Sequence, residues 1–227
     1  MIHEKINKTT SLQCNAKFFR TILFLEMNLM ILNNSTLTFQ FNEYEKIVIK
    51  IDKYPEDVPY CFYEAHFYMI NEYNQEILLS YDSLPSHLEA FIIALNQALQ
   101  NQRQIDSCFV QNIGYYWNES INGPDLEHPF NENYSILKKY SPWGAHTSTW
   151  IYNDEQGNII FEITPYYPHA HSDKYSYQDF LQWLKNYKSL FKMIIPRNIA
   201  HQWLIQATEI LAEIDANTDK LHSEGKL

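Results

Sequence analysis

Residues 147–165 read TSTWIYNDEQGNIIFEITP, two runs rich in β-branched and aromatic residues on either side of a short polar segment. Such runs favour β-strands, and Gly157 between them can take the positive φ angle that a tight turn needs. The stretch therefore predicts a β-hairpin. Glu162 interrupts the second run, and we expect it to be an outward-facing carboxylate because Phe161 and Ile163 would point to the opposite face.

Upstream segments predict further strands. Residues 36–52 and 60–81 each hold two strand-like apolar runs joined by a short polar turn. Alternation of apolar and polar residues with a period of two is the pattern of a half-buried strand. Residues 108–117 predict one more strand. Residues 118–146 are rich in Asn, Pro and Gly and predict a long irregular segment.

Helical spacing of apolar residues predicts three helices. The first covers residues 84–102, with a capping box from Ser86 to Glu89. The second begins after Ser176, and the third begins at Pro196, which suits a first helical turn. The residues expected to share a buried face are Phe180, Leu184, Tyr187 and Phe191 in the second helix, and Ile199, Trp203, Ala207, Ile210 and Ile214 in the third.

Together these elements predict an α+β fold, in which a mainly antiparallel sheet of hairpins and meanders is packed by one central and two C-terminal helices. The run Met69–Glu72 is matched by Ile151–Asp154, and each copy belongs to a predicted hairpin that is followed by a helix. This repetition suggests two β-meander-plus-helix units within a single α+β domain at residues 31–227.

We expect residues 1–30 to form a weakly ordered N-terminal extension. Their apolar stretch at 21–25 ends at Glu26, so it is far shorter than the roughly 20 residues of a membrane span. It also lacks the cleavage site of a signal peptide. Met27 and Met30 are alternative translation starts.

The three cysteines, Cys14, Cys61 and Cys108, are scattered and form no CxxC motif. This usage indicates a reducing, cytoplasmic compartment rather than a disulfide scaffold or a structural zinc site. Cys61 and Cys108 are expected to be small buried residues of strands.

The formal net charge is −10, from 17 basic and 27 acidic side chains. Such a chain repels nucleic acid unless its basic residues are segregated, and the spacing of Lys185, Lys188 and Lys192 instead suggests the solvated face of a helix. No glycine-rich dinucleotide-binding or P-loop motif occurs. The negative charge suits a basic protein partner, because complementary charge speeds encounter.

His169, His171 and Asp173 alternate along the segment PYYPHAHSDKY. In an extended segment they would project from one face, and two imidazoles with a carboxylate can bind a divalent metal ion. The candidates for a further ligand are His128, His146 and His201. Lys174 stands where the HxHxDH motif of metallo-β-lactamase-like hydrolases has its last histidine, so we favour a surface connection. The alternative is a metal-dependent hydrolase that uses these three residues.

Aromatic residues are abundant, at 15% of the chain, and many lie near the predicted irregular segment and the second hairpin. Tyrosine and tryptophan beside acidic side chains are typical anchors of protein recognition. The residues that we predict to contact a partner are Trp117, Trp143, Tyr166, Tyr167, Asp154 and Glu155.

Residues 150–214 resemble uncharacterised bacterial proteins with a W-x-YND-x-x-GNIIFEITP hairpin, a Y-x-x-F/W-x-x-x-Y helix and a final IP-x-x-x-A-x-x-W helix. The matching residues are Trp150, Tyr152, Asn153, Asp154, Gly157, Asn158, Tyr177, Phe180, Trp183, Tyr187, Ile195, Pro196, Ala200 and Trp203.

In its general character the small, acidic, aromatic-rich chain is also similar to the immunity proteins of bacterial polymorphic and contact-dependent toxin systems. That resemblance implies a non-catalytic, cytoplasmic inhibitor that masks a basic toxin domain. We expect no cofactor, no membrane association and no contact with nucleic acid.

Overall fold

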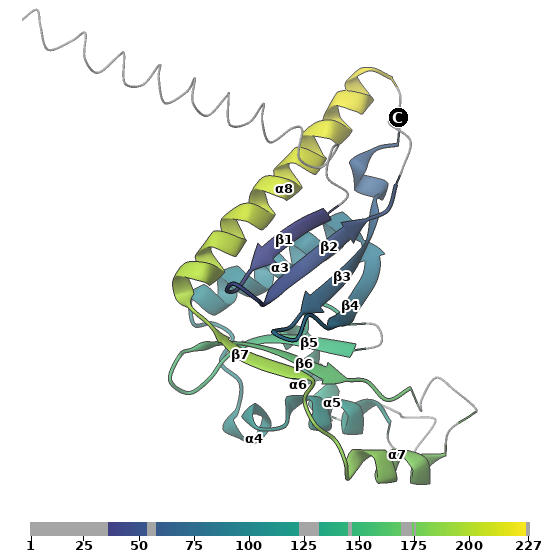
Figure 1. Cartoon of the computed structure of the whole chain (residues 1–227), viewed down its shortest axis with the longest axis vertical. Coiled ribbons are helices and arrows are strands. Elements are labelled where there is room, and N and C mark those ends of the chain that lie inside the picture. Colours follow the sequence, from purple (N-terminus) through teal and green to yellow (C-terminus); the bar gives the residue numbers. More distant parts are fainter. Residues whose placement is uncertain are drawn as a thin grey trace, which may run out of the picture.

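The computed structural model describes residues 36–53, 58–122, 132–144, 147–168, 174 and 176–225, and the expected extension at residues 1–30 lies outside them. Two antiparallel sheets and their flanking helices confirm the α+β fold (Figure 1). The first sheet has the strand order β1 (Thr36–Gln40), β2 (Lys46–Ile51), β3 (Glu64–Ile70) and β4 (Glu76–Ser83). The second sheet has the order β5 (Thr147–Asn153), β6 (Ile159–Pro165) and β7 (Phe191–Ile195).

One face of the first sheet packs against two helices, α3 (Leu84–Leu99) and α8 (Arg197–Ser223), which also pack on each other. Phe39 of β1 contacts Phe91 of α3 and Trp203 of α8 edge to face, with ring centroids 5.4 and 6.0 Å apart. The β3–β4 hairpin is followed by α3, and the β5–β6 hairpin is followed by α7 (Tyr177–Leu184), so a helix follows each copy of the repeated motif.

Strands β5 and β6 of the second sheet are buried on both sides. Phe161 faces the first sheet and meets Phe41 at a centroid distance of 5.7 Å. The opposite face lies under three short helices, α4 (Ser107–Val110), α5 (Ile113–Ile121) and α6 (Glu132–Leu137), with Trp150 and Tyr152 fully buried there. The hairpin predicted at residues 147–165 is confirmed, and Gly157 takes a φ of 78° in its turn.

The strand predicted at residues 108–117 is wrong, because α4 and α5 occupy this region. The Asp106 side chain caps α4 by accepting a hydrogen bond from the Cys108 amide at 3.1 Å. Neither cysteine that the structure describes is a buried strand residue. Cys108 is exposed, and Cys61 is half-buried in the 3-10 helix η1 (Tyr60–Phe62). The irregular segment predicted at 118–146 also contains α6 and a 3-10 helix at Lys138–Tyr140.

The second predicted helix is shorter than its apolar spacing suggests. It forms α7 (Tyr177–Leu184) with the full capping box of Ser176 and Asp179, whereas Phe191 begins β7. Pairing of β7 with β6 outweighs the helical spacing, so Lys192 lies on a strand and not on a helix face.

The third predicted helix is α8, and it follows Pro196 as expected. The capping box predicted at Ser86 is wrong, because α3 already begins at Leu84. Among the described helices, none has both the length and the apolar character needed to cross a membrane.

Helix α5 lies directly against β6 at Gly114. A Cβ atom at this position would overlap the Tyr187 hydroxyl and the Thr164 side chain. We therefore expect Gly114→Ala to lower the free energy of unfolding by about 1–3 kcal/mol, the usual cost of overpacking a core. Urea denaturation measures the change. Gly144→Ala is the matched control, because its nearest neighbour would be the Thr147 carbonyl oxygen at 3.7 Å; equal losses in both variants would contradict this packing.

His87 of α3 is half-buried between the helix and the first sheet. Its ring packs 4.9 Å from Phe67, and its Nε2 atom hydrogen-bonds with the Ser80 hydroxyl at 2.7 Å. Burial lowers the pKa of the imidazole below its usual value. Below about pH 6.5 this histidine therefore binds a proton in the unfolded chain more readily than in the folded chain.

We expect the free energy of unfolding to fall as the pH is lowered from about 6.5 towards the depressed pKa of His87. His87→Gln keeps a hydrogen-bonding side chain without an ionisable group, so its stability should depend less on pH. Urea denaturation at about pH 7.5 and about pH 5.5 compares the two proteins. His201→Gln, on the exposed face of α8, should keep the pH dependence of stability seen in the wild type. The same pH dependence in His87→Gln would show that His87 is not its source.

Candidate protein-binding surface

The predicted aromatic anchors are mostly packed within the protein. Trp143 is only 2% exposed, and its indole nitrogen donates to the His87 carbonyl oxygen at 3.0 Å, so it is a core residue and not a surface anchor. Tyr167 is also buried and packs against the α7 rings. Trp117 and Tyr166 are half-buried, and Trp117 stacks on Tyr134 with centroids 5.2 Å apart.

The two predicted acidic residues lie in the turn between β5 and β6. Asp154 uses its carboxylate within that turn, accepting from the amides of Gln156 at 3.0 Å and Asn158 at 2.8 Å. Glu155 is exposed. The six predicted contact residues therefore do not share one exposed surface.

The segment with the candidate metal ligands His169, His171 and Asp173 lies outside the described residues, as do His128 and His146. His201 is exposed on α8, and Lys174 is also exposed. Within the described part of the chain, no group of three or more His, Cys, Asp or Glu residues could hold a metal ion.

Glu162 is fully buried, which corrects the outward-facing position expected from the sequence. Its side chain points to the face of β6 that α4 and α5 cover, so helices replace solvent there. Three donors reach the carboxylate. The Tyr152 hydroxyl donates to Oε2 at 2.8 Å, the Lys192 ammonium pairs with Oε2 at 3.0 Å, and the Ser189 hydroxyl donates to Oε1.

The polar groups around Glu162 satisfy one another. Burial, and then the Glu162 carboxylate, raise the pKa of Tyr152, so its hydroxyl keeps the proton that it donates. Lys192 also donates to the Val110 carbonyl oxygen at 2.9 Å, which connects β7 to α4. The cluster thus ties three strands and a helix together, and these links indicate a structural role.

Two turns of the first sheet share the sequence Asn-Glu-Tyr, at residues 42–44 and 71–73. In the first turn, Asn42 Oδ1 accepts hydrogen bonds from the amides of Tyr44 and Glu45, both at 2.9 Å. In the second, Asn71 Oδ1 accepts from the amides of Tyr73 and Gln75, both at 3.0 Å. A short polar side chain thus fixes the backbone of each turn in the same way.

The asparagine amide groups add a second bond to each turn. Asn42 Nδ2 donates to Glu45 Oε2 at 2.7 Å, and Asn71 Nδ2 donates to Gln75 Oε1 at 3.0 Å. The tyrosines project from these fixed turns. Tyr73 is 74% exposed and Tyr44 is 65% exposed, the highest values among the large hydrophobic side chains that the structure describes.

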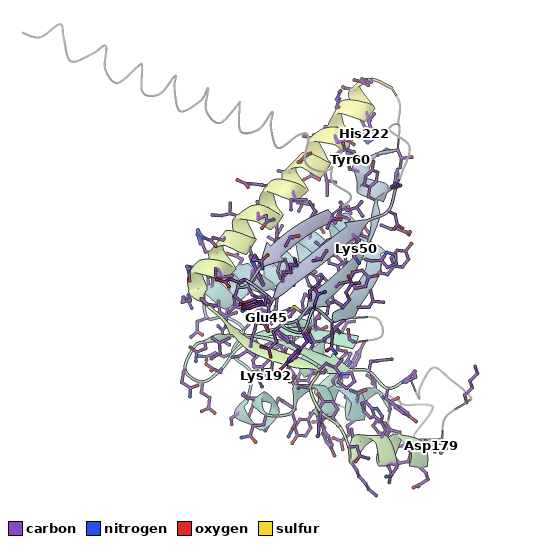
Figure 2. All side chains as sticks on the ribbon, viewed as in Figure 1. Glu45, Lys50, Tyr60, Asp179, Lys192 and His222 are labelled. Carbon is purple, nitrogen blue, oxygen red and sulfur yellow. The ribbon has the colours of Figure 1, made fainter. Side chains whose placement is uncertain are left out.

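Both turns lie at the same end of the first sheet, because they join β1 to β2 and β3 to β4 in one meander. They are two strand spacings apart, or about 10 Å. Glu43, Glu45 and Glu72 flank the tyrosines in sequence. Figure 2 shows Glu45 where the first sheet meets the second, between Lys50 and Lys192. We call this pair of acidic, aromatic turns the paired tyrosine turns.

The outer face of the first sheet continues the acidic and aromatic surface away from the paired tyrosine turns. The Tyr81 hydroxyl donates to Glu64 at 2.7 Å and to Asp52 at 3.3 Å. Lys50 pairs with Glu76 at 2.9 Å and lies over the Tyr68 ring. The predicted contact residues did not include these turns, although the repeated Asn-Glu-Tyr triplet in the sequence could have located them. The candidate surface lies on the first two hairpins and not near the β5–β6 hairpin.

Comparison of the chain with protein-family models, with curated proteins and with solved structures gave no significant match.

The salt bridge between Glu162 and Lys192 predicts a clear effect on stability. Lys192→Met leaves a buried carboxylate without its cation. We expect the free energy of unfolding to fall by about 3 kcal/mol, the lower end of the range for a broken buried pair. The lower end applies because the Lys192 side chain is 38% exposed. Urea denaturation provides the measurement.

Two variants control this experiment. Lys188→Met removes a charge from an exposed residue nearby and should change the stability little. Adding Glu162→Gln to Lys192→Met removes the stranded charge and should recover most of the loss. Wild-type stability in Lys192→Met alone would show that the pair does not hold β7 in place.

Proposed function

We propose that this chain is a non-catalytic binding protein, an immunity-type inhibitor that masks a basic toxin domain of a bacterial system in the cytoplasm. The observation that carries the proposal is the pair of tyrosine turns, where Tyr44 and Tyr73 are exposed beside glutamates. Inhibition would occur by steric occlusion, because this chain would cover the functional surface of the toxin domain.

The construction of the turns supports a role in recognition. A tyrosine side chain offers a large contact area while losing few rotatable bonds on binding. The hydrogen bonds of Asn42 and Asn71 hold each turn backbone before any partner arrives. A preorganised contact loses less conformational entropy on association and therefore gains affinity.

The charge of the chain supports a basic partner. The net charge is −10, and three glutamates flank the two exposed tyrosines. Complementary charge accelerates the encounter of two proteins and disfavours wrong pairings. Salt screens this attraction over about 8–10 Å at ordinary ionic strength, so association should slow as salt is added.

The test uses the protein encoded beside this chain's gene, purified as a complex or expressed with it in bacteria. Changing Tyr44 and Tyr73 together to Ala should weaken the complex by at least about thirtyfold, which corresponds to about 2 kcal/mol for the loss of central anchors. Surface plasmon resonance measures the affinity. Growth of cells that express the partner measures protection.

Phe62→Ala is the matched control, because Phe62 is an exposed aromatic residue of the connection at the other end of the first sheet. It should leave the affinity unchanged. Equal affinity of the double tyrosine variant and the wild type would overturn the assignment of the turns. Growth inhibition by the neighbouring protein that this chain does not relieve would overturn the inhibitor role.

A further inference from the structure

The two sheets have four edges, and two of them belong to the first sheet. Side chains of α8 cover the edge at β1, where Trp203 Nε1 donates to the Gln40 carbonyl oxygen and Gln206 Nε2 to the Thr38 carbonyl oxygen, both at 3.0 Å. The other edge, at β4, meets the second sheet. Thr147 Oγ1 of β5 donates to the Leu78 carbonyl oxygen of β4 at 2.9 Å.

The edge of the second sheet at β5 is covered by neighbouring loops. The Thr149 amide donates to the Trp143 carbonyl oxygen at 3.0 Å, and the Asn153 amide donates to the Arg103 carbonyl oxygen at 2.9 Å. Isolated bridges at Gly144 and Gln104 extend this cover. Three of the four edges thus have their backbone groups paired at least in part.

The edge at β7 is different. One side of this strand pairs with β6, and no hydrogen bond from any other described segment reaches the backbone of its other side. Figure 1 shows β7 as an outer strand of the second sheet. Ile194 is 55% exposed, and Leu190 just before the strand is 48% exposed. Proteins usually protect such an edge, because its free N–H and C=O groups can pair with another chain.

We infer that the free edge of β7 binds an extended segment of a protein partner, which adds a fourth strand to the second sheet. Main-chain hydrogen bonds supply the affinity in this mode, and alternate side chains supply the specificity. The five residues of β7 offer about 17 Å of edge. This site goes beyond the proposed function, because it requires neither the tyrosine turns nor a toxin.

The side chains of β7 indicate which segment fits. Leu190, Lys192 and Ile194 alternate along the chain, so they lie on one face. The aliphatic pair at its ends favours aliphatic residues on the added strand. The charge of Lys192 between them is already matched by Glu162, so a neutral residue such as threonine fits opposite it. We therefore expect an extended segment of aliphatic and threonine residues.

A second copy of this chain is a poorer occupant of the edge. Each copy has a net charge of −10, and two such copies repel each other as they approach. An added strand from a neutral or basic protein meets no such barrier.

The test uses a fluorescein-labelled peptide of seven alternating valine and threonine residues. We expect it to bind the wild-type protein, as measured by fluorescence anisotropy, and to slow hydrogen exchange at those amides of Phe191–Ile195 that do not pair with β6. The same peptide with N-methyl groups at alternate residues cannot donate along one edge. At least one of the two N-methylated registers should lose binding, since a strand pairs through alternate amides.

Two lysine substitutions locate the site on the protein. Ile194→Lys places a charge on the proposed edge and should weaken peptide binding at least tenfold. Ile205→Lys is the matched control, because Ile205 is an exposed isoleucine of α8, and it should bind as the wild type does. The double tyrosine variant should also bind the peptide normally, so a failure here is distinct from a failure of the proposed function.

The following outcomes would overturn the inference. The peptide does not bind, both N-methylated peptides bind as tightly as the parent, or Ile194→Lys has no effect. Dimers in analytical ultracentrifugation that disappear in Ile194→Lys would assign the edge to a second copy of the chain and would overturn the proposed occupant.

Discussion

The contact between Phe41 and Trp203 is the junction on which both sheets depend. Their ring centroids lie 4.3 Å apart, and Phe41 also meets Phe161 of the second sheet. One aromatic residue at the end of β1 therefore joins the first sheet, α8 and the second sheet. Phe41 is followed directly by Asn42, so the first of the tyrosine turns begins beside a residue that is packed in the core. A firmly packed base is what allows an exposed tyrosine to keep its position.

The Glu162 cluster imposes a second constraint, on the register of β7. Glu162 and Lys192 are direct partners across β6 and β7. A slip of one residue would place Phe191 or Met193 opposite the buried carboxylate and leave its charge unpaired, which is costly in a protein interior. The same pair that stabilises the sheet thus sets which side chains of β7 face outward, and it keeps a short edge strand well defined.

Local patterns were sufficient to predict the hairpins, because alternation and turn residues act over a few positions. They were insufficient where contacts between distant segments determine the secondary structure or the burial of a residue. The aromatic residues Tyr115 and Tyr116 favour a strand by composition, yet they lie in α5, which packs on the second sheet through Gly114. Glu162 was expected to face solvent because its neighbours Phe161 and Ile163 point to the opposite face, and no local signal reveals that helices cover the face of Glu162. The tyrosine turns share a triplet that our predictions did not use, and the sheet order is what places both turns at one end.

The position of α8 late in the chain has a consequence for folding during synthesis. Trp203 covers the Gln40 carbonyl oxygen from 163 residues further along the chain. During synthesis the first sheet therefore emerges with β1 uncovered. Its apolar face is covered completely only after α8 has been made. In this protein α8 covers the first sheet late in synthesis, and until α8 is made the β1 edge of that sheet can pair with other chains.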